Sequence, residues 1–463
     1  MKIIPDVNLQ NISQNYYLRL DYKINAYNFC IKKDYKNYWK IKDFLKIIRS
    51  RQITPDNFDT GYLIELGNIS DVGLNGVLKV NEIGSNKVIL NGANFAYCKL
   101  ETGKGYFIAL PNDIQGYDGS SLIVGSTELV PCRVNINNII AKYYLIHFKH
   151  IFDMFLSGKT HRRIHEIEFL NIKLPKIKID DESLNNIINN IISKENKIKE
   201  LQSQIKEPKL IVDEVFGKYF QLNLGQYSNL EKENVFEKTL LDLSKSVQLR
   251  SSFKFHHPKF DSILKKLKEF KTVKLKHLLK EPVKRGIQPE YDENGEILVV
   301  KTVNLRNGYI DLSEAEYVNS EFFEKKGKKA VIKYLDILIA STGTGSIGKV
   351  DIWESNKEAL ADGHISIVRV NQDKVNPYYL AYYLRSIFGY SQVEANFSGM
   401  SNQIEIYPDN IEKFEILLPD KTVQDQIVKE IDSKLKEQKE IIDQIEILKQ
   451  EIDKLIEKAI EVI

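Results

Sequence analysis

The sequence predicts an α+β fold with two tandem mixed α/β domains, each followed by a long helix that pairs with the other in a coiled coil. Two observations support this prediction. Landmarks of the first half return in the same order in the second half, and the chain after Pro419 contains neither proline nor glycine. At 463 residues the chain is too long for one ordinary domain. We expect a first domain at 1–180, a first helical region at 181–235, a second domain at 236–419 and a second helix at 420–463.

The internal repeat is visible in short landmarks. Each match is weak by itself, but their common order is hard to obtain by chance. A repeat of this length has the size of a whole domain, which excludes a solenoid or a propeller blade. The matched pairs are Arg51-x-Ile53-x-Pro55 with Arg285-x-Ile287-x-Pro289, Asn68-Ile69 with Asn304-Leu305, Thr102-Gly103 with Thr342-Gly343, Tyr143-Tyr144 with Tyr378-Tyr379, Ser157-Gly158 with Ser398-Gly399, and Leu174-Pro175 with Leu418-Pro419.

Within each copy, short apolar segments bounded by Gly, Asn and Asp predict strands. Examples are Tyr106–Ala109 in the first copy and Ile297–Val300 and Ile337–Ala340 in the second. A helix is expected to begin at Asn376-Pro377, since asparagine caps helices and proline suits their first turn. The sequence therefore predicts mixed α/β domains with the same internal plan.

The long helices are predicted from apolar spacing. From Ile441 onward apolar residues recur at alternating intervals of four and three, which is the heptad spacing of a coiled-coil seam. A helix over 424–462 would be roughly 58 Å long, and no domain of this size offers so long a face. We therefore expect the seam to pack on its counterpart in the first copy, which ends before Pro208; the alternative is that each helix packs only on its own domain. The candidate packing residues are Leu184, Ile188, Ile191, Ile198, Leu201, Ile431, Leu435, Ile445, Leu448, Ile452 and Leu455.

The net charge, the cysteines and the lengths of the apolar runs exclude several classes of protein. The formal net charge is +3, so any nucleic-acid surface must be local. Cys30, Cys98 and Cys132 have no paired spacing, which favours a reducing compartment over a disulfide framework. Pro5 and Asp6 come before any apolar region forms, so we do not expect the start of the sequence to act as a signal peptide. No apolar run approaches the roughly 20 residues that span a bilayer. We expect a cytoplasmic protein that does not contact a membrane.

The glycine-rich segment Gly343–Val350 looks like a nucleotide-binding loop but lacks its context. Such loops need a helix directly afterwards, and here an alternating strand pattern follows. Val350 also offers no hydroxyl for Mg²⁺. The segment therefore predicts a tight turn between two strands.

No other motif predicts catalysis. Asn376-Pro377 lacks the second proline of the Asn-Pro-Pro-Tyr loop of adenine methyltransferases, and no separate cofactor motif is present. The histidines His161 and His256 have no set of about four suitably spaced ligands for zinc. We expect no catalytic residues, no metal and no cofactor on this chain.

Basic residues gather locally and could contact phosphate groups. Residues 250–285 contain 12 Lys and Arg against three acidic residues, interleaved with Phe. A solvated lysine-rich face is the alternative, but similar patches recur in both copies, and the glycine-rich turns offer polar groups to base edges. The candidate DNA-binding residues are Lys104, Lys159, Thr160, His161, Arg162, Arg163, Lys284, Arg285, Thr342, Thr344, Ser346, Lys349, Ser401, Asn402 and Gln403.

Three features of the second copy carry a family resemblance. A last strand ends at Pro419 before a helix start at Gln424, a glycine turn over Ser341–Val350 follows a strand led by Asp336, and a loop over Ser398–Gln403 precedes the last strand. In these features the sequence resembles the specificity (S) subunits of type I restriction–modification systems, over essentially the whole chain. The first copy departs from the pattern, because no glutamine follows its Leu-Pro and its glycine turn is shorter.

The resemblance implies two target recognition domains that each read half of a split sequence in double-stranded DNA. It implies antiparallel spacer helices, and hence a pseudo-twofold arrangement of the two copies. It also implies partners: two adenine-N6 DNA methyltransferase subunits, which would bind S-adenosylmethionine, and motor–nuclease restriction subunits. Two alternatives remain: a specificity component of another DNA modification or defence system, and a coiled-coil scaffold with no role on DNA.

Overall fold

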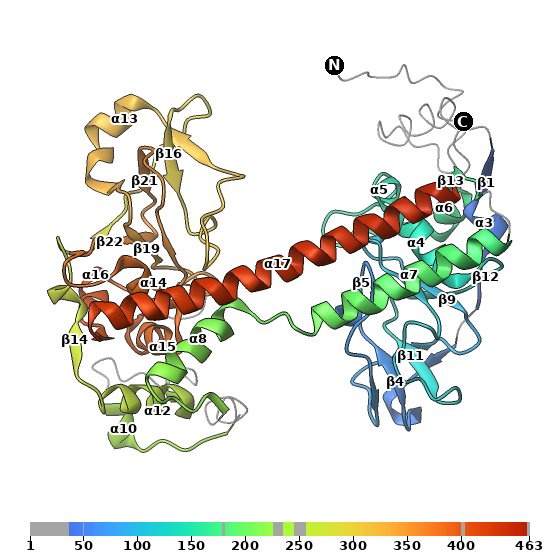
Figure 1. The fold of residues 1–463 in the computed structure, drawn as a ribbon, viewed down its shortest axis with the longest axis horizontal. Helices are drawn as coiled ribbons and strands as arrows, with labels where there is room; N and C mark the ends of the chain where they lie inside the picture. The colour runs from blue at the N-terminus through green and yellow to red at the C-terminus, as the bar shows by residue number, and fades with distance from the viewer. Residues whose placement is uncertain are drawn as a thin grey trace. The chain divides into compact units, whose positions relative to one another are not determined.

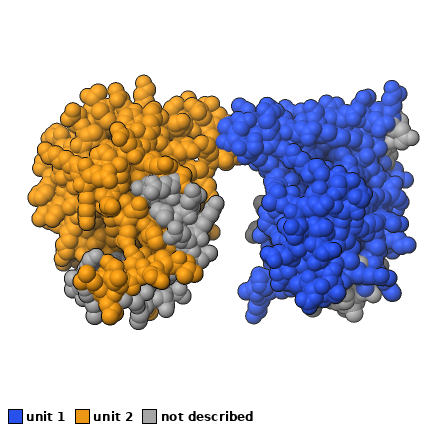
Figure 2. All heavy atoms as spheres, turned by 90° about the horizontal axis from the view of Figure 1, so that it is seen from below, with its two compact units in different colours: residues 1–204, 441–463 blue, residues 205–440 orange. Residues whose placement is uncertain are grey.

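The structure, a computed structural model, describes residues 37–49, 51–177, 181–225, 235–244, 256–399 and 403–460. The chain forms two compact units, one of residues 1–204 with 441–463 and one of residues 205–440 (Figure 2). The sequence predicts domains and helical regions at 1–180, 181–235, 236–419 and 420–463. These boundaries divide the chain differently from the two compact units, and they stay a prediction. Among the helices that the structure describes, none is long and apolar enough to cross a membrane.

Unit 1 contains a four-stranded and a five-stranded sheet, ordered β10-β9-β12-β2 and β3-β8-β11-β4-β7, and smaller pairs β1-β13 and β5-β6. The strands are β1 Tyr38–Lys40, β2 Leu45–Ile47, β3 Gln52–Ile53, β4 Gly61–Ile64, β5 Ile69–Ser70, β6 Gly73–Leu74, β7 Leu78–Val80, β8 Lys87–Ile89, β9 Phe95–Cys98, β10 Phe107–Ala109, β11 Leu122–Gly125, β12 Leu129–Val134 and β13 Lys173–Pro175. The helices are α3 Ile41–Phe44, α4 Asn138–His147, α5 Lys149–Phe152, α6 Glu166–Asn171 and α7 Asp181–Gln202.

Unit 2 has two four-stranded sheets, ordered β20-β19-β22-β15 and β18-β21-β16-β17, and the pair β14-β23. The strands are β14 Thr272–Lys274, β15 Lys284–Arg285, β16 Ile297–Val300, β17 Glu316–Val318, β18 Val331–Ile332, β19 Ile337–Ala340, β20 Val350–Ile352, β21 Ala359–Ala361, β22 Ile365–Val368 and β23 Glu415–Leu417. The helices are α8 Pro208–Tyr219, α10 Leu240–Ser244, α12 Pro258–Leu267, α13 Ser320–Lys325, α14 Pro377–Arg385, α15 Ile387–Asn396 and α16 Pro408–Ile411, followed by α17 Lys421–Ala459.

The two units repeat one strand order, which confirms the predicted duplication. The strands β10-β9-β12 correspond to β20-β19-β22, and β8-β11-β4-β7 corresponds to β18-β21-β16-β17. The pairing of Leu45 in β2 with Val134 in β12 returns as the bridge between Leu279 and Val370. The sense of pairing also agrees, because β11 runs parallel to β4 and β21 runs parallel to β16. The mixed α/β architecture expected from the sequence is confirmed.

One central strand in each unit is buried on both faces. Residues Ile337 and Ile339 of β19 pack with the helices of unit 2, whereas Leu338 and Ala340 pack against the second sheet. In β9 the odd-numbered residues likewise join the helical core and the even-numbered residues join the core of the five-stranded sheet. Alternate side chains of a strand point to opposite faces, so a strand between two layers must be apolar throughout.

A pair of asparagines explains one landmark of the repeat. Asn68 and Asn304 each accept a hydrogen bond from the backbone N–H three residues earlier, at 2.8 Å in both cases. Each side-chain amide also donates to the carbonyl seven residues later, at 3.0 and 2.9 Å. Asparagine suits both places because its short side chain can accept one hydrogen bond and donate another.

The local predictions of the second copy are confirmed. Gly343 and Gly348 have φ of 88° and 81° in the turn between β19 and β20, which pair antiparallel. A side chain is strained at such φ values, so glycine fits here. Asn376 caps α14, accepting hydrogen bonds from the N–H groups of Tyr378 and Tyr379 at 2.8 and 3.3 Å.

Helix α17 contributes to both units. It begins at Lys421, three residues before the expected start at 424, and its first part to Glu440 belongs to unit 2. Ile431 is buried in the core of unit 2 and Leu435 packs against that core, so these two candidate packing residues contact their own domain.

The last part of α17 packs in unit 1, beside α7 (Figure 1). The two helices run in opposite directions here, because Lys194 pairs with Glu451 while Ile177 forms a β-bridge with Ile460. The expected packing of the seam on its counterpart is therefore confirmed for the end of α17, and the alternative that each helix packs only on its own domain is wrong for α17. The remaining candidate packing residues all belong to this core: Leu184, Ile188, Ile191, Ile198, Leu201, Ile445, Leu448, Ile452 and Leu455.

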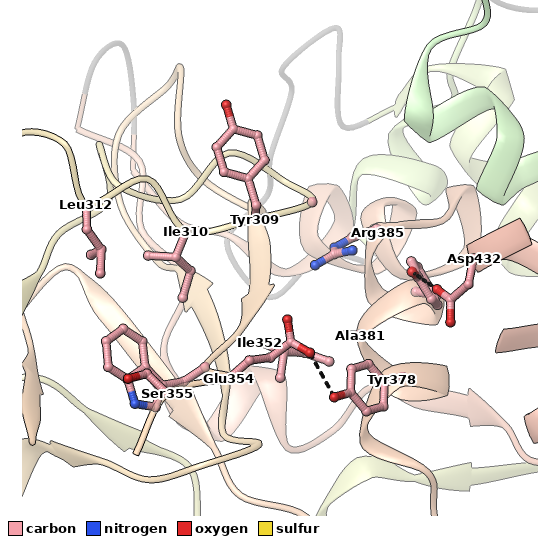
Figure 3. Close-up of a pocket in the computed structure, with 13 residues that line it drawn as sticks. Tyr309, Ile310, Leu312, Ile352, Glu354, Ser355, Tyr378, Ala381, Arg385 and Asp432 are labelled. Carbon is pink, nitrogen blue, oxygen red and sulfur yellow. Dashed lines mark hydrogen bonds between the residues drawn. The ribbon is translucent and has the colours of Figure 1, made fainter. Parts of the chain in front are cut away.

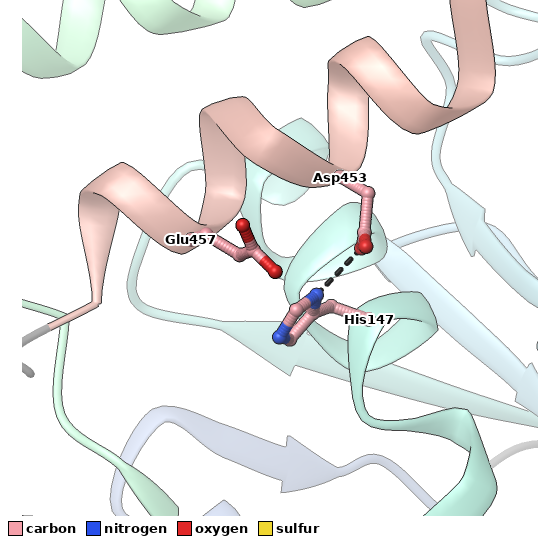
Figure 4. A group of neighbouring side chains, drawn as sticks. All are labelled: His147, Asp453 and Glu457. Atoms are coloured by element: carbon pink, nitrogen blue, oxygen red, sulfur yellow. Dashed lines mark hydrogen bonds and ion pairs between the residues drawn. The ribbon is translucent and has the colours of Figure 1, made fainter. Parts of the chain in front are cut away.

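Helix α17 also contacts α4 in unit 1. The Nδ1 atom of His147 lies 2.5 Å from a carboxylate oxygen of Asp453, and Glu457 lies beside them one turn later (Figure 4). Lys449 adds an ion pair with Asp71 at 3.1 Å. The end of the second repeat is thus attached to the first domain by polar contacts as well as by its apolar seam.

Candidate nucleic-acid interface

The glycine turn of unit 2 lies against the loop that precedes the last strand. Thr342 and Ser398 both form β-bridges with Glu405, and the N–H of Gly343 donates to the carbonyl of Ile404 at 3.1 Å. The fold thus brings together two segments that the sequence proposed separately. Of the candidates in this loop, Gln403 is exposed, and Ser401 and Asn402 lie outside the described residues.

Unit 1 builds the same frame from its own loops. Leu100 and Ser157 both form β-bridges with Arg163, and the N–H of Glu101 donates to the carbonyl of Arg162 at 2.9 Å. These are the segments that carry the repeated Thr-Gly and Ser-Gly landmarks. The repeat therefore preserves a junction of two loops, and its side chains differ between the copies.

The two arginines of this junction are held by carboxylates. Arg162 donates two hydrogen bonds to Glu101, at 2.7 and 3.2 Å, and Arg163 donates two to Glu128, at 2.7 and 3.0 Å. These bonds lower the pKa of both Glu101 and Glu128. A phosphate group would have to compete with a bidentate pair for either arginine.

Four other candidates of unit 1 are exposed around this junction: Lys104, Lys159, Thr160 and His161. Neither lysine has an ion pair within the part of the chain that the structure describes. Lys104 and Lys159 are therefore the uncompensated cations of the junction, and the sequence alone could not separate them from the adjacent arginines.

Two basic candidates of unit 2, Lys284 and Arg285, are paired as well. Arg285 donates to the carbonyl of Gly363 at 2.7 Å and forms an ion pair with Glu405, and Lys284 pairs with Glu281. The hydrogen bond of Lys284 lowers the pKa of Glu281. These contacts stabilise the junction itself.

The polar candidates of the glycine turn reach its surface. Thr344 is exposed, and Thr342, Ser346 and Lys349 are half-buried. The hydroxyl of Thr342 lies 2.8 Å from Nδ1 of His364, a residue that sequence reasoning missed. The sequence indicated this role only weakly, because His364 follows Asp362-Gly363, a pair that is common in ordinary turns.

Sequence reasoning also missed Lys209 of α8. Its ammonium lies 4.4 Å from the ring centre of Tyr390, and both residues line a hollow of about 240 Å³ with Thr344 and Lys349. Lys209 is far from the glycine turn in the sequence, so only the fold could bring it there. The hollow joins two lysines to the turn, an arrangement suited to a phosphate group.

Comparison with known proteins gives one family. Residues 267–462 match the family described as "Type I restriction modification DNA specificity domain". No curated protein matches the chain. The expected family resemblance is thus confirmed over this segment.

Solved structures resemble the chain at low identity. The S subunit of a type I restriction–modification system from M. genitalium has 12% identity and a TM-score of 0.46, over 92% of this chain and 96% of that chain. The HsdS subunit from Thermoanaerobacter tengcongensis has 12% identity and a TM-score of 0.30, over 92% and 96%. TM-scores of this size do not establish a common fold, and the family match carries the assignment.

Proposed function

Since residues 267–462 belong to the type I restriction modification DNA specificity domain family, we propose that the chain reads a two-part target in double-stranded DNA. Each of the two repeated domains would recognise one short half-site. The family match applies directly to the second domain, and the repeat extends the proposal to the first.

The observation that carries this proposal is the shared strand order of the two units. The first domain lies outside the matched segment, yet its two larger sheets follow the order and pairing sense found in the second. The junction of loops is also repeated, with Arg163 in one copy where Glu405 stands in the other. One scaffold with different side chains is what two unlike half-sites require, because bases are distinguished by a few polar side chains.

The spacing of the half-sites would follow from the long helices. We propose that α7 and α17 act as an antiparallel coiled-coil spacer and relate the two copies by a pseudo-twofold axis. The opposed directions of α7 and the end of α17, and their shared apolar core, support this. Helix α7 has 22 residues and α17 has 39, which correspond to ~33 and ~58 Å. Half-site centres would therefore lie roughly one to two turns of DNA apart, at ~34–36 Å per turn.

The chemistry would belong to partners. We propose that this chain has no catalytic role, and that two adenine-N6 methyltransferase subunits, which carry S-adenosylmethionine, dock on it together with motor–nuclease restriction subunits. The membership of the second domain in a specificity family supports this division of labour.

Methylation mapping tests the proposal. The chain is produced in cells together with the methyltransferase encoded beside it, and methylated adenines are located by sequencing. We expect two short unlike half-sites with a constant gap, and methylation that disappears without this chain. A target in one uninterrupted block would contradict the two-domain mechanism. Duplex binding without partner-dependent methylation would favour another modification system, and no binding to any duplex at low salt would favour a scaffold.

A further inference from the structure

A pocket of about 550 Å³ opens in unit 2 beside the start of the long helix (Figure 3). It is formed by the loop before Leu312, the end of β20, helix α14 and one residue of α17. This pocket is separate from the glycine turn, although Arg385 borders both it and the hollow at Lys209. None of the candidate DNA-binding residues that the structure describes lines it.

Trp353 lines the pocket and carries a buried indole N–H. Trp353 is 2% exposed, and its indole N–H makes no hydrogen bond with any residue that the structure describes. Leaving a buried donor unpaired costs free energy, and native proteins rarely do so without a reason. Trp353 itself lies in the lining of the pocket, so its indole signal can report on a molecule bound there.

The walls are aromatic and acidic. Tyr378 donates to Glu354 at 2.8 Å, and Tyr382 donates to Asp432 (Figure 3). Both carboxylates belong to exposed residues and so face solvent at the pocket. Tyr309, 64% exposed, adds a third tyrosine.

The single cation of the lining is already neutralised. Arg385 is 8% exposed, lies 3.1 Å from the carboxylate of Asp351 and donates to the carbonyl of Val350 at 2.7 Å. Glu354 and Asp432 are therefore the uncompensated charges among the lining residues. A negative pocket with tyrosine rings repels phosphate and attracts a cation.

We propose that this pocket binds an arginine or lysine side chain of a protein partner. Glu354 and Asp432 pair with its cationic head, and the tyrosine rings cover its aliphatic stem. The inference rests on the proposed function only in taking the partner to be a protein subunit of the same complex. The volume accommodates one long side chain and its adjoining backbone.

The two tryptophans of the chain allow a direct test. Trp39 of unit 1 donates its indole N–H to the hydroxyl of Tyr144 at 2.9 Å and serves as an internal reference. The intact chain is labelled with ¹⁵N-tryptophan, and the two indole signals are followed by NMR while acetyl-Gly-Arg-Gly-amide is added. The matched control is acetyl-Gly-Gln-Gly-amide, which keeps the carbonyls and lacks the charge.

We expect a saturable shift of the Trp353 signal with the arginine peptide and an unchanged Trp39 signal. The glutamine peptide, and the arginine peptide on the double variant Glu354→Gln with Asp432→Asn, should bind at least about tenfold more weakly. Both substituted residues are exposed, so the fold should persist; if it does not, Tyr309→Ala should weaken binding instead.

Three outcomes overturn the inference: no shift of Trp353, equal shifts with both peptides, or a stronger shift with adenosine than with the arginine peptide. Duplex binding at low salt is measured on the same samples. Loss of peptide binding with DNA binding intact counts against this pocket alone. Loss of DNA binding with peptide binding intact counts against the proposed function.

Discussion

Arg163 and Glu405 occupy the same position in the two repeats and carry opposite charges. Arg163 exchanges backbone hydrogen bonds with Ser157 at 2.8 and 2.9 Å, and Glu405 exchanges them with Ser398 at 2.7 and 2.8 Å. Each side chain then pairs with an opposite charge from elsewhere in its own unit, Arg163 with Glu128 and Glu405 with Arg285. The backbone junction is preserved while its charge is reversed, so the two domains present different surfaces.

The pairing of Arg163 predicts how charge at the junction controls DNA affinity. Glu128→Gln removes the partner of Arg163, so we expect tighter non-specific binding and a salt slope steeper by about one. Lys159→Gln should weaken binding to all sequences and reduce the slope by about one. Binding to a duplex across a series of salt concentrations measures both effects.

Lys197→Gln is the control for this experiment, because Lys197 is half exposed on α7 and pairs with Glu200. It should leave the salt slope unchanged. A changed sequence preference with an unchanged slope would show that Lys159 contacts bases.

The lowered pKa of Glu128 also sets a pH window. The ion pair of Glu128 with Arg163 contributes to folding stability above the pKa of glutamate in the unfolded chain, about 4.3. This contribution is lost as the pH falls through the lower pKa of the folded state.

A buried ion cluster ties α7 to the first domain. The ammonium of Lys142, 0% exposed, lies 2.7 Å from Asp113 and 3.0 Å from Glu195 of α7. Burial lowers the pKa of Lys142, but its pairs with Asp113 and Glu195 outweigh burial and raise it. Lys142→Met removes the buried ammonium between the two carboxylates. Among the described residues, Asp113 then keeps only the N–H of Ala109 and Glu195 only Lys199, so the substitution should destabilise unit 1 by about 3–5 kcal/mol.

Urea unfolding can assign this loss to unit 1, since Trp39 lies in unit 1 and Trp353 in unit 2. Trp353→Phe leaves the fluorescence of Trp39 to report on unit 1 alone. Lys149→Met is the control, because the ammonium of Lys149 is exposed and lies 3.8 Å from Asp71; it should cost less than about 1 kcal/mol. An equal effect of the two substitutions would contradict the role given to the cluster.

The seam of α17 predicts a contrast between buried and exposed isoleucines. Ile452 is 2% exposed in the core shared with α7, whereas Ile447 is 54% exposed on the same helix. Ile452→Ala should lower the free energy of unfolding of unit 1 by about 2–5 kcal/mol, and Ile447→Ala should change it by less than about 0.5 kcal/mol. Mapped half-sites should keep their bases in both variants. Altered bases in Ile452→Ala would show that the helix reads sequence.

The buried thiols should be unreactive. Cys98 and Cys132 are 1% and 0% exposed, and burial raises the pKa of Cys98 to about 11. At pH 8 only about one part in a thousand of such a thiol is ionised. In a Cys30→Ser variant, a disulfide reagent should find no fast thiol in the native chain and two in denaturant. One fast thiol in the native state would show that this core opens readily.

The purified chain should transfer no methyl group to DNA. The proposal assigns S-adenosylmethionine and the reacting groups to the partner subunits. Incubation with labelled methyl donor and DNA should give background incorporation, which rises when the neighbouring methyltransferase is added. Incorporation by the chain alone, unchanged by repurification, would contradict the proposal.

The sequence by itself determined the duplication, the types of element and the caps. The strand Ile337–Ala340, the glycine turn after it and the cap at Asn376 follow from local rules: side-chain period, positive φ and the unpaired N–H groups of a helix start. These depend on residues close together along the chain. They were therefore predictable without knowledge of the fold.

Only the tertiary structure decided which distant residues meet. It placed Lys209 beside the glycine turn, tied Arg163 to Glu128 and packed the end of α17 on the first domain. Such contacts join segments separated by tens to hundreds of residues. Their geometry is set by how sheets and helices pack, which a local pattern does not encode. Charge in the sequence marked basic stretches, but burial and pairing determined which of those charges remain available to DNA.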